Sequence, residues 1–77
     1  MSRQVTAEQH DAIQALLTDV GRAEGAQGIE SIVETGYRGD VPAALLAAFG
    51  GDDKHARGHI RSEAYDIYAH PDFERSR

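Results

Sequence analysis

The chain has no cysteine and no tryptophan, and aromatic residues make up only 6% of it. Without cysteine it has no disulfide framework, no thiolate metal ligand and no thiol nucleophile. No apolar run approaches the roughly 20 residues that a membrane-spanning helix needs. The N-terminal stretch from Met1 to Thr6 also lacks the apolar segment of a secretory signal. These absences predict a cytoplasmic protein that makes no contact with a membrane.

Basic side chains are scarce as well. Eight Lys and Arg residues stand against 13 Asp and Glu residues, and the formal net charge is −5 over 77 residues. Sequence-independent nucleic-acid binding requires a basic surface, so this balance argues against it. A chain of this length forms one small domain with a modest core. We therefore expect a single domain over residues 1–77, with frayed tails at 1–5 and 72–77.

The spacing of apolar residues predicts an all-α fold, a compact bundle of about four helices. The first helix is expected over residues 7–20, because Thr6 and Gln9 form a capping box before the chain's clearest helical period. That period consists of Ile13, Leu16, Leu17 and Val20. Gly21 is the expected helix end, and the three glycines of residues 21–28 predict a connecting loop.

Two shorter helices are expected in the middle of the chain. Ile29, Ile32 and Val33 predict a helix over residues 29–35 that ends at Gly36, with a β-strand as the alternative. Residues 41–49 are apolar almost all round, and Asp40 is the expected N-cap. Leu45, Leu46 and Phe49 are the strongest core predictions. Such a helix is buried within the chain or covered by a dimer or another partner.

The longest helix is expected over residues 53–69, after the Gly50–Gly51 break and before Pro71. At 100° per residue it has three faces. The core face carries Ala56, Ile60, Ala64 and Ile67, with Tyr68 at its edge. A polar stripe carries His55, His59, Ser62, Glu63 and Asp66. A basic stripe carries Lys54, Arg57, Arg61 and Tyr65.

No arrangement of residues indicates an enzyme. His55 and His59 are spaced as two metal ligands one helical turn apart, and Glu63 follows one turn later. The metalloprotease pattern is absent, however, because no Glu directly follows the first His. A solvated stripe without metal or cofactor is the favoured interpretation, and His55 and His59 remain weak metal candidates. No serine lies in a nucleophile elbow.

Binding to another protein is the function that the sequence favours. Arginine and tyrosine are frequent in interfaces, which makes Lys54, Arg57, Arg61, Tyr65 and Tyr68 candidates. Glu30, Glu34 and Asp40 are acidic interface candidates. We expect a small acidic regulator or inhibitor that acts by stoichiometric interaction, and a homodimer is possible. By analogy with small accessory proteins of phages and mobile elements, it would block a host nucleic-acid-binding protein or nuclease.

The alternative is a DNA-binding regulator. The helices at 41–49 and 53–69, with the glycine break between them, have lengths compatible with a helix-turn-helix. The basic stripe would then face the DNA groove. Against this, Asp52 and Asp53 would approach the phosphates, and the domain is acidic.

One partial resemblance covers about residues 29–60. The segments Ile32–Tyr37 and Ala44–Ala48, followed by Gly51–Asp52, resemble the three-helix ubiquitin-associated pattern, which has a Gly-Phe/Tyr loop and a Gly-Asp turn. Thr35 stands where that family has methionine, and Asp53 and Arg57 stand where it has apolar residues. Membership is therefore not assigned. The resemblance implies a module that binds other proteins.

Overall fold

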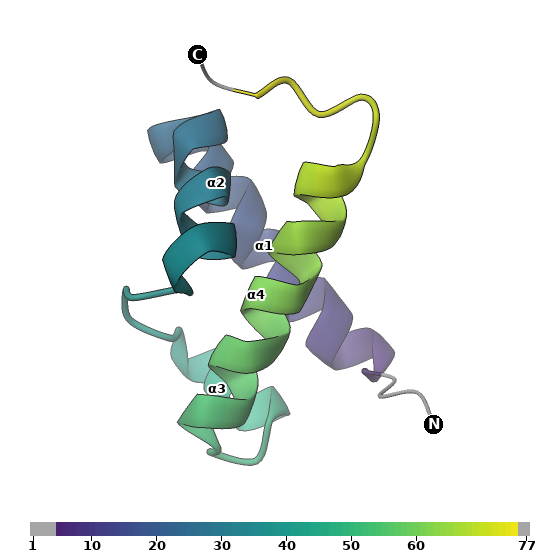
Figure 1. The fold of residues 1–77 in the computed structure, drawn as a ribbon. Coiled ribbons are helices and arrows are strands. Elements are labelled where there is room, and N and C mark those ends of the chain that lie inside the picture. The colour runs from purple at the N-terminus through teal and green to yellow at the C-terminus, as the bar shows by residue number, and fades with distance from the viewer. Residues whose placement is uncertain (1–4, 76–77) are drawn as a thin grey trace.

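The computed structural model describes residues 5–75, which form four helices and no strand. In chain order these are α1 (Ala7–Glu24), α2 (Ala26–Thr35), α3 (Ala43–Ala48) and α4 (Asp53–Ala69) (Figure 1). The predicted all-α bundle is confirmed. The strand alternative for residues 29–35 is wrong, because that segment belongs to α2.

Helix α1 begins where the sequence predicts and ends later. Its capping box is present: the Thr6 hydroxyl accepts from the Gln9 amide at 3.0 Å, and the Gln9 side chain accepts from the Thr6 amide at 2.9 Å. The predicted end at Gly21 is wrong, because α1 continues through it to Glu24. A glycine costs helix stability without forbidding the helical conformation.

A single residue, Gly25, separates α1 from α2, so the predicted loop over residues 21–28 is wrong. Gly25 has a φ of +68°, which residues with a side chain rarely adopt, and the chain turns there. Helix α2 then starts three residues before its predicted start. Gly28 is buried where the two helices meet, and a Cβ there would lie 2.7 Å from Val20 Cγ1. The predicted end of α2 is confirmed, since Gly36 caps it with φ +87°.

Helix α3 is shorter than the predicted 41–49. Asp40 does not cap it: Pro42 is the N-cap residue, and no side chain donates or accepts there. The backbone carbonyl of Asp40 instead accepts from the Tyr37 hydroxyl at 2.8 Å. Leu45 and Phe49 are buried as predicted, whereas Leu46 is only half-buried. One side of α3 thus faces away from the core, and it is made of the exposed residues Ala43, Ala44 and Ala47.

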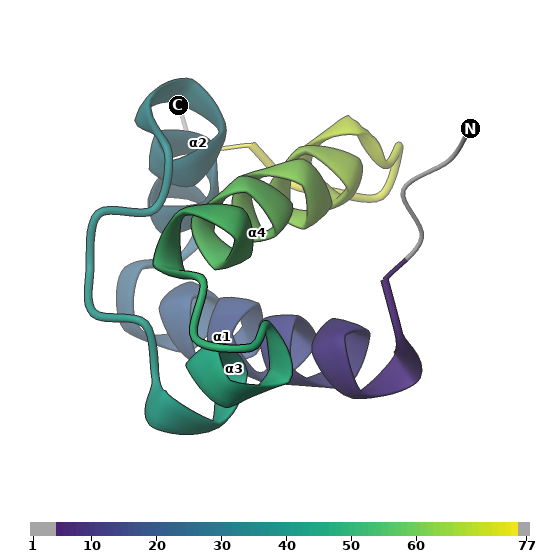
Figure 2. The same ribbon diagram turned by 90° about the horizontal axis from the view of Figure 1, so that it is seen from below.

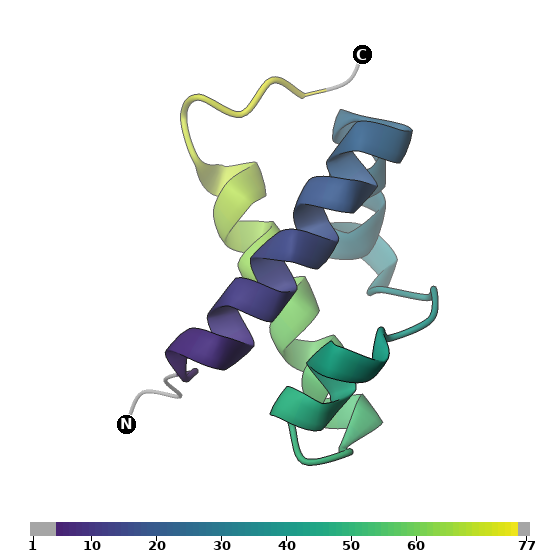
Figure 3. The same ribbon diagram turned by 180° about the vertical axis from the view of Figure 1, so that it is seen from behind.

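Helix α4 has the predicted bounds. The Asp52 carboxylate accepts from the His55 amide at 3.1 Å, and the helix stops before Pro71. Ala56, Ile60 and Ala64 are fully buried on its core face. Because two of these side chains are methyl groups, α4 packs closely against α2 and α1. Views from opposite sides show α1 crossing α4 near the middle of both helices (Figures 1 and 3).

The buried residues form one cluster to which all four helices contribute. It contains Ile13, Leu16, Leu17, Ile29, Ile32, Leu45, Phe49, Ala56, Ile60 and Ala64. From below, α4 lies over α1 and α3 (Figure 2). The radius of gyration is 12.0 Å, close to the ~11.5 Å expected for a compact chain of this length. None of the described helices combines the length and apolar character needed to cross a membrane.

The C-terminal segment packs along the end of α4 instead of extending from it. Phe73 is half-buried, with its ring centroid 5.7 Å from that of Tyr68. Arg75 donates to the Tyr68 carbonyl at 2.8 Å and lies over the Tyr68 ring. Of the tails expected to fray, residues 1–4 and 76–77 lie outside the described residues. Within residues 72–75, Phe73 and Arg75 contact Tyr68 of α4.

Candidate functional site

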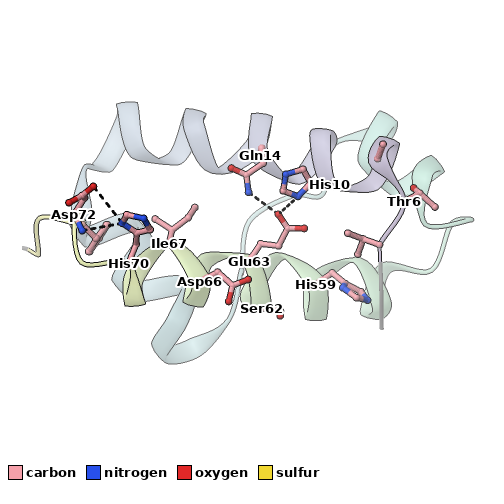
Figure 4. Close-up of a pocket in the computed structure, with 13 residues that line it drawn as sticks. Thr6, His10, Gln14, His59, Ser62, Glu63, Asp66, Ile67, His70 and Asp72 are labelled. Carbon is pink, nitrogen blue, oxygen red and sulfur yellow. Dashed lines mark hydrogen bonds and ion pairs between the residues drawn. The ribbon is translucent and has the colours of Figure 1, made fainter. Parts of the chain in front are cut away.

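A groove of about 930 Å³ lies between α1 and α4. Its walls are the first half of α1 and the part of α4 from His59 onward, and the segment after α4 contributes one end (Figure 4). It is lined by Val5, Thr6, Ala7, His10, Gln14, His59, Ser62, Glu63, Asp66, Ile67, His70, Asp72 and Phe73. We call this hollow the α1–α4 groove.

Glu63 lies inside the α1–α4 groove and is only 9% exposed. Its carboxylate accepts from the Gln14 side-chain amide at 2.8 Å and lies 3.0 Å from His10 Nδ1 (Figure 4). Buried carboxylates need such partners because burial removes their water. The sequence-based placement of Glu63 on a solvated stripe is wrong, since α1 crosses α4 and covers this position.

The charge of the groove is one-sided. Its described lining includes the carboxylates of Glu63, Asp66 and Asp72 and no lysine or arginine. Asp66 has no ion-pair partner among the described residues, and Asp72 lies 3.9 Å from the His70 ring nitrogen. Further lining comes from apolar side chains, among them Val5, Ile67 and Phe73. The groove therefore combines apolar contact area with acidic groups.

The structure places Arg61 of the predicted basic stripe against the end of α2. Its guanidinium donates to the carbonyls of Val33 at 3.0 Å and Glu34 at 3.2 Å. These carbonyls belong to the last turn of α2, where helix geometry leaves them without a partner. Arg61 thus provides a C-terminal cap from another helix, and its donor groups face the chain itself.

Arg57 makes a similar contact one turn earlier on α4. It donates to the carbonyls of Tyr37 at 2.9 Å and Gly39 at 2.8 Å, and to the Asp53 carboxylate at 2.6 Å. The hydrogen bond to Asp53 raises the pKa of Arg57 above its usual value. Burial raises the pKa of Tyr37, and the nearby Asp40 carboxylate adds to the effect. Arg61 thus attaches the end of α2 to α4, and Arg57 attaches the loop after α2 to α4.

The other interface candidates do not form one surface. Lys54 is exposed in the first turn of α4, while Tyr68 is half-buried near its end under Arg75. Along a helix their separation corresponds to about 21 Å. Tyr65 is the exposed aromatic residue of α4, at 56% exposure. The acidic candidates lie elsewhere: Glu34 and Asp40 are exposed and Glu30 is half-buried.

The weak metal candidates His55 and His59 lie together in the first half of α4, and His59 also lines the α1–α4 groove. Their Nε2 atoms are 3.1 Å apart, and both rings contact Phe49. No group of three or more His, Cys, Asp or Glu side chains in residues 5–75 is arranged to hold a metal ion. The two imidazoles therefore make at most a two-ligand site.

The sequence did not reveal the α1–α4 groove. His10 and Gln14 are one turn apart on α1, which is a signal for a shared partner, but nothing local identifies Glu63 as that partner. The chain matches no family model, no curated protein and no solved structure. The partial resemblance to ubiquitin-associated domains gains no support from these comparisons, so any function must be argued from the groove itself.

Proposed function

We propose that the protein is a stoichiometric protein-binding module whose α1–α4 groove receives a basic segment of its partner, anchored by an apolar side chain. The observation that carries this proposal is the lining of the groove, which pairs apolar side chains with three carboxylates and includes no described cation. Binding would act by occupying the partner's surface and involves no chemical turnover.

The size of the groove suits such a ligand. Binding pockets commonly enclose roughly 300–1,000 Å³, and the α1–α4 groove has about 930 Å³. Ile67 and Phe73 offer apolar contact to an anchor side chain, and the carboxylates of Asp66 and Asp72 offer charge to flanking Lys or Arg. Complementary charge of this kind fixes the register of a ligand and speeds its association.

A basic partner segment is typical of nucleic-acid-binding proteins, since these neutralise phosphates with Lys and Arg. A cytoplasmic regulator or inhibitor that blocks such a protein, or a nuclease, is consistent with the net charge of −5. An accessory protein of a phage or mobile element would act in this way. DNA binding by α4 has less support, because Arg57 and Arg61 donate to carbonyls of their own chain.

Two charge reversals test the proposal. Asp66→Lys places a cation in the groove, whereas Asp19→Lys makes the same charge change at an exposed α1 position outside it. Tagged wild type and both variants would be purified from cells that naturally produce the chain, and the captured partner quantified. We expect Asp66→Lys to lower capture by about tenfold or more, because like charges would then face each other. Asp19→Lys should change it by less than about twofold, since distant exposed charges are screened.

Equal losses in both variants would show that only net charge matters and would overturn the groove assignment. Recovery of DNA instead of protein would favour the α4 alternative. Recovery of a small molecule in the groove would replace a protein partner with a ligand. Circular dichroism of each variant, compared with wild type, checks that the fold is intact.

A further inference from the structure

Two imidazoles in the first half of α4 meet in a geometry that suits a metal ion. His55 Nε2 and His59 Nε2 are 3.1 Å apart. Two nitrogen ligands at the usual 2.0–2.1 Å from a tetrahedral ion lie about 3.3 Å apart. In a square-planar arrangement, adjacent nitrogens lie about 2.8 Å apart. The observed separation falls between these values, so small ring rotations suffice for either geometry.

Phe49 holds both rings in place. Its side chain is 6% exposed and contacts His55 edge-on at 5.3 Å and His59 in a stacked arrangement at 5.4 Å. The centroids of the two imidazole rings are 4.8 Å apart. Fixing the rings before an ion arrives reduces the entropy that binding would otherwise cost. A pair of freely rotating surface histidines would lack this advantage.

Gly58 keeps the space beside the pair open. It helps line a hollow of about 340 Å³ together with Lys54, His55, His59 and Ser62. A Cβ at Gly58 would meet no atom within 4 Å, so helix packing does not require glycine here. Glycine nevertheless costs helix stability. The open space beside Gly58 leaves room for water or another ligand at the imidazoles.

We infer that His55 and His59 form a two-imidazole site for a divalent first-row transition-metal ion such as Zn²⁺. Neutral imidazole nitrogens are common ligands for Zn, Cu and Ni. The ion would take the place of the proton that lies between the two Nε2 atoms. The ring that carries this proton would change tautomer, with the proton on its Nδ1, so both imidazoles bind as neutral ligands and no net proton is released. The other positions of the ion are left to water or to an incoming ligand. Lys54 beside the hollow lowers the affinity by repulsion, so the bound ion exchanges readily.

The test is a Zn²⁺ titration of the full chain, followed by calorimetry and by NMR of the imidazole nitrogens. We expect one ion per chain and a selective shift of Nε2 in both His55 and His59. His55→Asn and His59→Asn should each weaken binding by about tenfold or more, because the second imidazole no longer binds intramolecularly. The control is His70→Asn. His70 is an exposed histidine at the C-terminal end of α4, near Asp72. This variant should leave the affinity within about twofold.

The inference is overturned if His70→Asn weakens binding as much as the other variants do, or if neither His55 nor His59 shifts. Helix content by circular dichroism separates lost ligands from lost folding. Lys54→Ala gives a second readout that does not alter the ligands. Removing the Lys54 charge should strengthen Zn²⁺ binding, and unchanged or weaker binding would contradict the inference. His59 also lines the α1–α4 groove. Because the titration uses the chain without a partner, its result does not depend on whether the groove binds a protein.

Discussion

At the scale of single residues, Glu63 shows how an interior position can carry a charge. It follows Ile60 by three residues and precedes Ala64, both fully buried, so it lies at the edge of the core face of α4. Its carboxylate is satisfied there by Gln14 and His10 from α1. This pairing also positions the two walls of the α1–α4 groove relative to each other.

We predict that Glu63→Ala lowers the free energy of unfolding by about 1–3 kcal/mol, because the Gln14 amide loses its acceptor in a half-buried position. The control is Glu34→Ala, which removes an exposed carboxylate from α2 and should change stability by less than about 0.5 kcal/mol. Urea denaturation measures both. Equal effects would mean that the Gln14 and His10 contacts contribute nothing specific.

Residue patterns predicted much of the core because burial follows helical period. Ile13 and Ile60, predicted from that period, are among the largest fully buried side chains. Leu45 is another, and it was predicted from the apolar character of its whole helix. Leu46 was predicted to be buried and is half-buried. In a helix apolar on nearly every side, the period cannot identify the face that meets the core. That choice depends on where α1 and α4 lie.

At the scale of elements, the sequence predicted the four helices but placed the connection between α1 and α2 wrongly. Thr6, Asp52 and Pro71 gave correct limits because capping and proline act locally. Gly21 was mistaken for a helix end, since the same residue type occurs in helices and at their ends. Gly25, four residues later, is the one that takes a positive φ. The helix end lies at Gly25 and not at Gly21, and the turn at Gly25 brings Gly28 against Val20 and Glu24.

The α1–α2 connection leads to opposite predictions for two glycines. Gly21→Ala should raise the free energy of unfolding by about 0.5–1 kcal/mol, because it is helical and a Cβ there meets nothing. Gly25→Ala should lower it by about 1–3 kcal/mol, because φ +68° and ψ −156° suit glycine almost alone. Thermal and urea unfolding of the two variants measure the difference. If Gly21→Ala destabilised the protein, α1 would end earlier than described.

The basic stripe was predicted to be an interface, but its two arginines donate to backbone carbonyls of the same chain. A helical wheel shows Arg57 and Arg61 on one face of α4 but gives no information about what covers that face. The end of α2 and the loop after it lie there, and their carbonyls accept from both guanidiniums. The arginines consequently support the fold, and the acidic groove offers the stronger candidate interface.

At the scale of the whole molecule, the groove exists because α1 crosses α4 and the chain's C-terminal segment folds back. His10 and Glu63 are 53 positions apart in the sequence and meet only in the folded chain. Residue periodicity contains no information on such a crossing. The fold class could therefore be predicted, while the site that it creates could not.

The most direct test of the central claim is site-specific photo-crosslinking in cells that naturally produce the chain. A photoreactive residue would replace Ala7 or Ser62, exposed positions on the two walls of the α1–α4 groove. The matched controls are Ala23 and Ala43, exposed positions on α1 and α3 outside it. We expect one protein to be crosslinked from both walls and from neither control position. Adducts formed only at the control positions, or equally at all four, would contradict it.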